Sequence, residues 1–203
     1  MRAIARAVGL TAAILAATAF LAAPAATAAT KTTIYNNIPS PLPGNVPSVG
    51  FEASAASEFG GQVGFDGTAR MKPKVKVVMS SFGCQGGHWN TGDCSTTPGA
   101  TFSEQLTLNV YTVGELNEPG TMIGTVTHTF NMPYRPAANY TKCTGEDAGK
   151  WFDSDTATCY NGKAFTKSVS LGTLDLPDTA IIGIAYNTTH YGYSPIGESA
   201  ACY

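Results

Sequence analysis

The sequence predicts an all-β fold, an antiparallel β-sandwich of jelly-roll type with two long disulfide-closed loops. Three observations support this fold class. Apolar and polar residues alternate with a period of two, helical periodicity is nearly absent, and turn-forming residues separate the alternating segments. The Cys–Trp–Cys core spacing of immunoglobulin domains is missing, which favours a jelly roll over an immunoglobulin-type sandwich.

Six segments carry the strand pattern, and they give the order of the predicted elements. Within 104–113, the residues Leu106, Leu108 and Val110 are expected to point inward, because side chains alternate between the two faces of a strand. The segment 180–188 is apolar on both faces, which predicts a central strand. The six predicted strands are 62–68, 74–81, 104–113, 124–132, 167–176 and 180–188.

The first 28 residues have the pattern of a secretory signal peptide. Arg2 and Arg6 precede an alanine-rich apolar run, and Ala26 and Ala28 fit positions −3 and −1 of a cleavage site. Removing this segment leaves ten Lys and Arg against fourteen Asp and Glu, a mildly acidic balance. We therefore expect a secreted, extracellular protein without a membrane span, for which nucleic acid is a poor partner.

Residues 29–48 are predicted to form an extended, proline-rich N-terminal arm, followed by the sandwich domain at 49–203. A linker is disfavoured because only about seven residues would remain before Asn36 after signal cleavage. A PxxP-type ligand is disfavoured because no basic residue flanks the prolines. The arm is expected to be ordered and to lie across the sandwich. Its prolines are Pro39, Pro41, Pro43 and Pro47.

Five cysteines in an exported chain favour disulfides over thiol chemistry. The spacing suggests the local pairs Cys84–Cys94 and Cys143–Cys159, each closing a polar, glycine-rich loop worth about 2.5–3 kcal/mol. Four cysteines allow three pairings, so the sequence leaves the connectivity open. Cys202 is unpaired in this scheme. We expect it to be a half-cystine whose partner lies beyond the chain, with a reactive thiol as the alternative.

Several long blocks resemble a group of uncharacterised exported bacterial proteins, found especially in actinobacteria. The blocks read NNIPSPLPGNVPSVGFEA, SSFGCQGGHWNTGDCSTTPGATF, LTLNVYTVG, FNMPYRP and GIAYNTTHYGYSPIG. Some relatives in that group carry C-terminal sorting or anchor segments. The resemblance implies no established activity, substrate or catalytic residue. Its members usually continue past an ESACY-like sequence into further strands, so it implies a sandwich truncated after Tyr203.

Two long segments, 82–101 and 133–162, are predicted to be loops, and each carries one of the two tryptophans. Long loops without secondary structure tend to be functional. Aromatic rings stack on sugar C–H faces while neighbouring polar groups bind hydroxyls, so these loops suggest a carbohydrate-binding module. The alternative is that the aromatic residues cap the end of the core. The candidate ligand-binding residues are Trp89, Asn90, Asp93, Trp151, Asp153, Tyr160, Tyr191 and Tyr193.

The sequence contains no G-x-S-x-G elbow, no clear carboxylate pair and no zinc-ligand spacing. We therefore expect no enzymatic activity and no catalytic residue, no cofactor and no metal. A structural Ca²⁺ site in the acidic loop is an alternative, with Glu146, Asp147, Asp153 and Asp155 as its ligands. The leading expectation is a structural or surface role in the extracellular space or cell envelope. The alternatives are carbohydrate binding, with a polysaccharide or envelope component as partner, and a secreted hydrolase.

Overall fold

The computed structural model describes residues 31–48 and 56–186. The described residues from Thr32 onward belong to one compact unit. The expected signal peptide at 1–28, the cysteine Cys202 and the candidate residues Tyr191 and Tyr193 lie outside the described residues.

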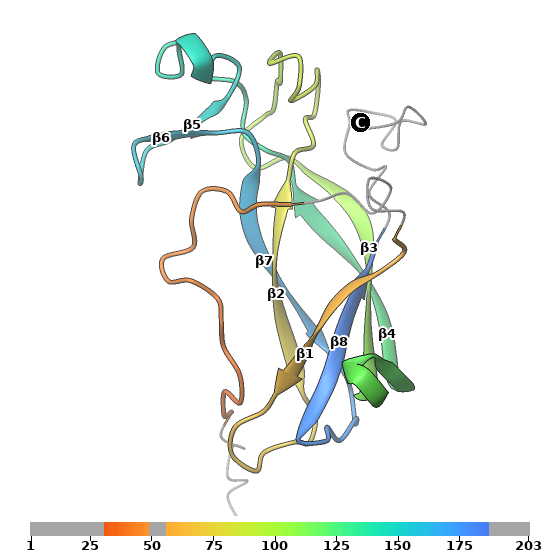
Figure 1. Ribbon diagram of the computed structural model, residues 1–203. Helices are drawn as coiled ribbons and strands as arrows, with labels where there is room; N and C mark the ends of the chain where they lie inside the picture. Colours follow the sequence, from red (N-terminus) through yellow and green to blue (C-terminus); the bar gives the residue numbers. More distant parts are fainter. Residues whose placement is uncertain (1–30, 49–55, 187–203) are drawn as a thin grey trace, which may run out of the picture. The chain divides into compact units, whose positions relative to one another are not determined.

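The described chain is built from strands, and its only helical elements there are single 3₁₀ turns (Figure 1). No helix in the described ranges has the length and apolar character needed to cross a membrane. The strands are β1 Phe59–Gly64, β2 Lys74–Ser81, β3 Thr101–Val113, β4 Pro119–Pro133, β5 Trp151–Asp153, β6 Thr158–Tyr160, β7 Lys163–Ser170 and β8 Thr179–Ala185, with 3₁₀ turns η2 Glu115–Asn117 and η3 Gly145–Asp147.

The strands form a four-stranded sheet in the order β1-β8-β3-β4, a two-stranded sheet of β2 and β7, and the short hairpin β5–β6. All these pairings are antiparallel. The nested pairing of β1 with β8 and β2 with β7 is the wrapping expected of a jelly roll. The predicted all-β antiparallel fold is confirmed, and β8 occupies the central position predicted for 180–188.

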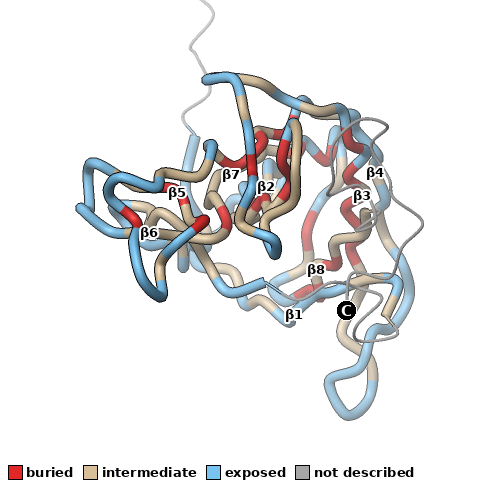
Figure 2. Tube along the Cα trace, turned by 90° about the horizontal axis from the view of Figure 1, so that it is seen from above, coloured by how far each residue is buried: buried red, intermediate tan, exposed pale blue. Residues whose placement is uncertain are grey.

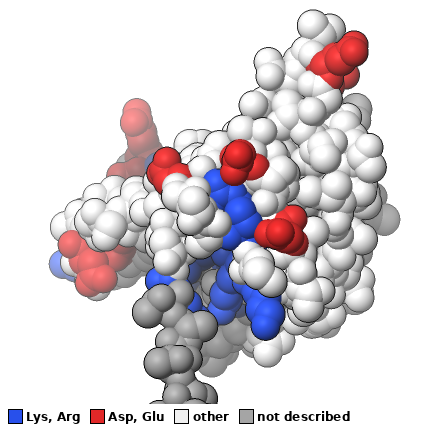
Figure 3. All heavy atoms as spheres, turned by 90° about the horizontal axis from the view of Figure 1, so that it is seen from below, with Lys and Arg blue, Asp and Glu red and all other residues white. Residues whose placement is uncertain are grey.

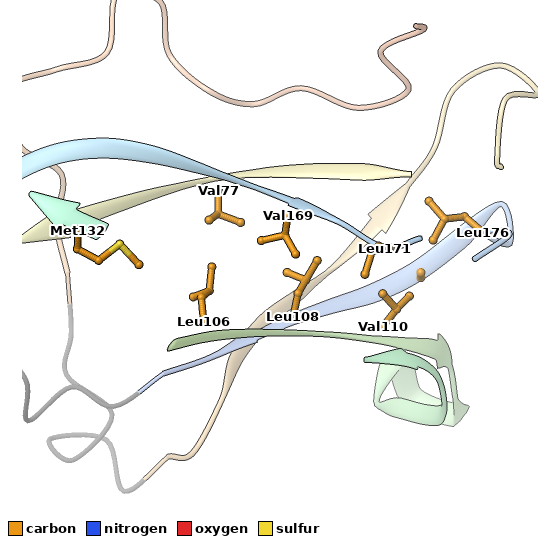
Figure 4. Close-up of a cluster of buried hydrophobic side chains, with 9 residues drawn as sticks. Val77, Leu106, Leu108, Val110, Met132, Val169, Leu171 and Leu176 are labelled. Carbon is orange, nitrogen blue, oxygen red and sulfur yellow. The ribbon is translucent and has the colours of Figure 1, made fainter. Parts of the chain in front are cut away.

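The hydrophobic core lies between the four-stranded sheet and the β2–β7 pair. Leu106, Leu108 and Val110 of β3 are fully buried and point toward Val77 and Val169 on the opposite strands (Figure 4). Figure 2 shows that buried positions lie along the strands of both sheets, β3 and β8 on one side and β2 and β7 on the other. Each fully buried leucine contributes about 2 kcal/mol of transfer free energy. The inward orientation predicted from the alternation in β3 is confirmed.

The outer face of the four-stranded sheet is polar. Thr107 on β3 and Thr127 on β4 stand directly opposite each other, with their hydroxyl oxygens 2.7 Å apart. The Thr125 hydroxyl donates to the side-chain oxygen of Asn109 at 2.6 Å. Because the same strands bury leucines on the other face, this sheet separates an apolar layer from a hydroxyl- and amide-bearing surface.

The N-terminal arm contacts the sandwich at two places. The Ile34 carbonyl accepts from the Asp66 backbone N–H at 2.8 Å, and the Ile34 side chain packs against the core. The Gly44 carbonyl accepts from the N–H of Ala164 on β7 at 2.8 Å. These contacts join the arm to the loop after β1 and to β7, so the described arm is part of the packed structure.

The loop between β1 and β2 is organised by Arg70. Its guanidinium donates to four backbone carbonyl oxygens and to the carboxylate of Asp178 at 3.0 Å. Figure 3 views this end of the sandwich and shows Lys and Arg side chains gathered together, with Asp and Glu around them. The four accepting carbonyls belong to Phe65, Asp66, Gly67 and Ala69.

The strand predicted at 167–176 differs from the observed β7, which runs from Lys163 to Ser170. The prediction extended the strand too far, because the alternating leucines after Ser170 reach the core from a loop and not from a strand. Leu171 and Leu176 are buried and Leu174 packs against the same core, although none of the three lies in a strand. The short β5–β6 hairpin was not predicted, since its three-residue strands are too short to show a period.

We expect Leu108→Ala to lower the free energy of unfolding by about 2–5 kcal/mol, because it opens a cavity between the two sheets. The matched control is Leu116→Ala, since Leu116 is 92% exposed and should change stability by less than about 0.5 kcal/mol. Urea denaturation followed by tryptophan fluorescence measures both. Equal effects for the two variants would contradict the packing described here.

Candidate functional site

The two long loops, 82–100 and 134–150, pack against each other as one loop cluster. Its cross-links tie together segments that are far apart in the sequence. Four hydrogen bonds cross between the loops. They run from Tyr134 N–H to Ala100 O at 3.2 Å, from Arg135 N–H to Gly83 O at 2.9 Å, from Ala138 N–H to Cys94 O at 2.9 Å, and from Tyr140 O–H to Gly92 O at 2.6 Å.

Two disulfides hold the loop cluster. Cys84 bonds to Cys94 within the first loop, and Cys143 of the second loop bonds to Cys159 on β6, which confirms the predicted pairing. Closing loops of this length is worth about 3 kcal/mol each in the chain-entropy model. Disulfides persist in oxidising compartments, so the pair indicates an extracellular type of environment.

Arg135 lies at the centre of the loop cluster and is fully buried. Its guanidinium donates to the carbonyl oxygens of Gly149 at 2.8 Å and Pro136 at 3.3 Å. Burial lowers the pKa of Arg135 to about 10, which still leaves the group protonated at neutral pH. Gly149 has a φ of +83°, and a Cβ there would overlap the Cα of Gly92. The buried cation therefore binds backbone carbonyls at the closest approach of the two loops.

Trp151 is part of the packed interior. Its side chain is only 6% exposed, and its indole N–H donates to the Gly162 carbonyl at 2.7 Å. The ring of Tyr160 lies 5.7 Å away, and the Lys163 ammonium is 5.4 Å from the Trp151 ring centre. The described structure therefore offers no open ring face at Trp151 for stacking on a sugar.

Trp89, Asn90 and Asp93 lie on the first loop. Trp89 is half-buried, with its ring edge-on to Phe82 at 5.2 Å, and Asn90 is exposed. The Asp93 carboxylate accepts from the His88 backbone N–H at 2.8 Å and from the Thr91 hydroxyl at 2.5 Å. The hydrogen bond from His88 is the main cause of the lowered pKa of Asp93. Asp93 thus stabilises the turn of its own loop.

Asp153 and Tyr160 belong to the β5–β6 hairpin. The Asp153 carboxylate accepts from the Asp155 backbone N–H at 3.1 Å and the Thr156 hydroxyl at 3.0 Å, which fixes the turn between the strands. Tyr160 packs on Trp151. The predicted residues thus form two groups, and no ring contact joins Trp89 to Trp151 in the described part of the chain.

The acidic residues proposed as Ca²⁺ ligands are engaged separately. Asp147 forms an ion pair with the Lys150 ammonium at 2.6 Å, and Asp153 binds its own turn. Within 31–48 and 56–186, no three His, Cys, Asp or Glu side chains are grouped as a metal site would require.

A second polar cluster, which the sequence did not single out, centres on Glu58 just before β1. One carboxylate oxygen of Glu58 accepts from the Asn109 amide at 3.1 Å and the Tyr111 hydroxyl at 2.9 Å. Burial, followed by this hydrogen bond, raises the pKa of Tyr111. The carboxylate crosses β8 at Gly183, where a Cβ would occupy the same space. Glu58 therefore links β1 to β3 across the outer face.

A groove of about 580 Å³ lies on the same outer face. It is lined mainly by hydroxyl and amide side chains from β3 and β4, and it reaches the end of β8. The lining residues are Ser57, Ser103, Glu104, Gln105, Thr107, Thr129, Ala185 and Tyr186. The outward alternation of β3 predicted part of this surface, but the contributions of Ser57 and Tyr186 depend on tertiary packing.

Comparisons with family models, with curated proteins and with solved structures find no match to this chain. The functional argument therefore rests on the geometry of the loop cluster and the outer face.

We expect Asp93→Ala to speed hydrogen exchange at the His88 amide, because the substitution removes its acceptor. In the native chain, the pKa of Asp93 lies below 3.8, so its stabilisation is present above pH 3.8 and is lost as the pH falls through that lower pKa. NMR exchange measured between pH 2 and 6 tests this. Asp155→Ala, an exposed carboxylate in the β5–β6 turn, is the control, and equal protection in both variants would contradict the assignment.

We expect Arg135→Ala to destabilise the protein by about 3 kcal/mol, since it leaves a buried cavity and unsatisfied carbonyls. Lys142→Ala removes an exposed cation from the same loop and should cost less than about 0.5 kcal/mol. Chemical denaturation of the oxidised protein measures both changes. A small effect at Arg135 would show that the guanidinium does not hold the second loop, 134–150, in place.

Proposed function

We propose that this protein is a secreted, non-enzymatic β-sandwich with a structural or surface role in the extracellular space or cell envelope. The loop cluster is the observation that carries this proposal. Four hydrogen bonds cross between the two loops, two disulfides restrict them, and the buried Arg135 guanidinium binds carbonyls of its own loop. Loops fixed in this way present a constant surface rather than a closing lid.

The side chains of the loop cluster and of the adjoining β5–β6 hairpin further support a non-catalytic role. A general acid or base must exchange protons with a substrate. Asp93, Asp147 and Asp153 instead bind their own loop backbone or a neighbouring lysine. The aromatic ring of Trp151 is likewise enclosed. These polar and aromatic side chains therefore stabilise the fold of the loops and the hairpin.

Secretion is tested by expressing the chain with its native first 28 residues in an exporting bacterium. We expect the protein in the medium or envelope fraction, with residue 29 at its N-terminus and with Cys84, Cys94, Cys143 and Cys159 resistant to alkylation. Ala28→Asp should block cleavage and leave a longer precursor, because position −1 requires a small residue. Intact mass and cysteine alkylation read out both results. A reduced, uncleaved native chain in the cytoplasm would overturn the proposal.

Carbohydrate binding through the loops is the second candidate. It is favoured by the half-buried ring of Trp89 beside the exposed Asn90. If this candidate is correct, titration with cell-wall or plant polysaccharides should shift tryptophan fluorescence, and Trp89→Ala should abolish the shift. A flat response across a glycan array would exclude the loop site. A hydrolase would instead form product on a substrate panel.

A further inference from the structure

The groove on the outer face of the four-stranded sheet crosses three strands. Gln105 on β3 stands directly opposite Thr129 on β4, and Thr107 stands opposite Ala185 on β8. Since neighbouring strands lie about 4.8 Å apart, the floor from β4 to β8 is about 10 Å across. The register therefore places side chains from separate parts of the sequence on two adjacent outward-facing rows of the sheet.

The groove presents hydrogen-bonding groups that are available to a ligand. Ser103, Gln105 and Thr129 are exposed, and their side chains make no hydrogen bond within the described part of the chain. Hydroxyl groups can both donate and accept, and the amide of Gln105 offers both functions side by side. This set matches a ligand that itself carries many hydroxyl groups.

The floor and surroundings of the groove are held in place. Thr107 is fixed by its hydrogen bond to Thr127, and the neighbouring Asn109 is fixed between Thr125 and Glu58. Side chains fixed in this way lose little conformational entropy on binding. The exposed groups of the groove thus stand on a rigid sheet rather than on a loop.

The charge of the lining distinguishes among ligand classes. Among the described residues that line the groove, Glu104 is the one carboxyl group, and none is Lys or Arg. A polyanion would find no cation in the groove, and Glu58 adds a second carboxylate nearby on the same face. A protein partner usually requires a central apolar anchor, and no Trp, Phe, Leu, Ile, Val or Met is among the described residues that line the groove. An uncharged, polyhydroxylated chain is the ligand class that fits.

We propose that this groove binds a neutral polysaccharide, with Gln105 and Thr129 as its central hydrogen-bonding pair. The proposal does not rest on the structural role inferred above, because it concerns the sheet face and not the loop cluster. It also separates glycan binding from Trp89 and Trp151.

The test is isothermal titration calorimetry of the full chain with soluble xylan, a β-glucan and chitin hexaose. We expect at least one of these to bind. Gln105→Ala combined with Thr129→Ala should weaken that binding about tenfold or more, since each lost hydrogen bond costs about 0.5–1.5 kcal/mol. Gln62→Ala is the matched control: Gln62 is exposed on β1 and stands opposite Ile181 on β8, outside the groove. The Gln62→Ala variant should bind the glycan with the same affinity as the native chain.

Thermal melting of each variant identifies any loss of folding. Trp89→Ala should bind as tightly as the native chain, whereas loss of binding in this variant would assign the glycan to the loops. Absence of binding to all three glycans, or equal binding by the double variant, would overturn the groove proposal. A dimer in sedimentation that the double variant abolishes would likewise overturn it, by assigning the groove to contact between copies.

Discussion

The alternation of side chains along β3 is the constraint on which the rest of the structure depends. This strand pairs with both β8 and β4, so its two faces set the two faces of the sheet. Leu106 and Leu108 close the core against β2 and β7, while Gln105 and Thr107 between them form the floor of the groove. A slip of one residue would exchange these sets, burying hydroxyls and exposing leucines. Core stability and the polar surface are therefore specified by the same register.

The loop cluster is ordered by different interactions from those of the sheets. Two long loops contain few apolar residues, so packing alone cannot order them. Disulfides reduce their freedom. The buried guanidinium of Arg135 binds two carbonyl oxygens of its own loop, and its backbone N–H donates to Gly83 in the other loop. Desolvation lowers the pKa of this arginine, and two hydrogen bonds to carbonyl oxygens stabilise its charge. The cluster is thus ordered by polar and covalent links.

The sequence allowed prediction of features that depend on local pattern. Period-two alternation identified β2, β3, β4 and β8, and loop spacing identified the two disulfides. For Trp151 the sequence left sugar binding and packing on the core as alternatives. It could not decide between them, because the carbonyl of Gly162 and the ring of Tyr160 reach Trp151 only after the β5–β6 hairpin forms. The groove was equally hidden, since Ser57, Thr129 and Tyr186 meet only through strand pairing.

The register of β3 with β4 is regular where β3 lines the groove and irregular at the other end of the strand. The pairing of β3 with β4 shifts register between Val110 and Tyr111 and again before Val113. A bulge bends its strand and increases the local twist. From Thr101 to Val110 the register is continuous, and the groove residues of β3 all fall within this part. The irregularity is therefore confined to the end of the strand near Glu58 and Tyr111. The Glu58 carboxylate crosses β8 there and links the start of the edge strand β1 to β3. The part of β3 with continuous register holds its outward side chains at regular positions.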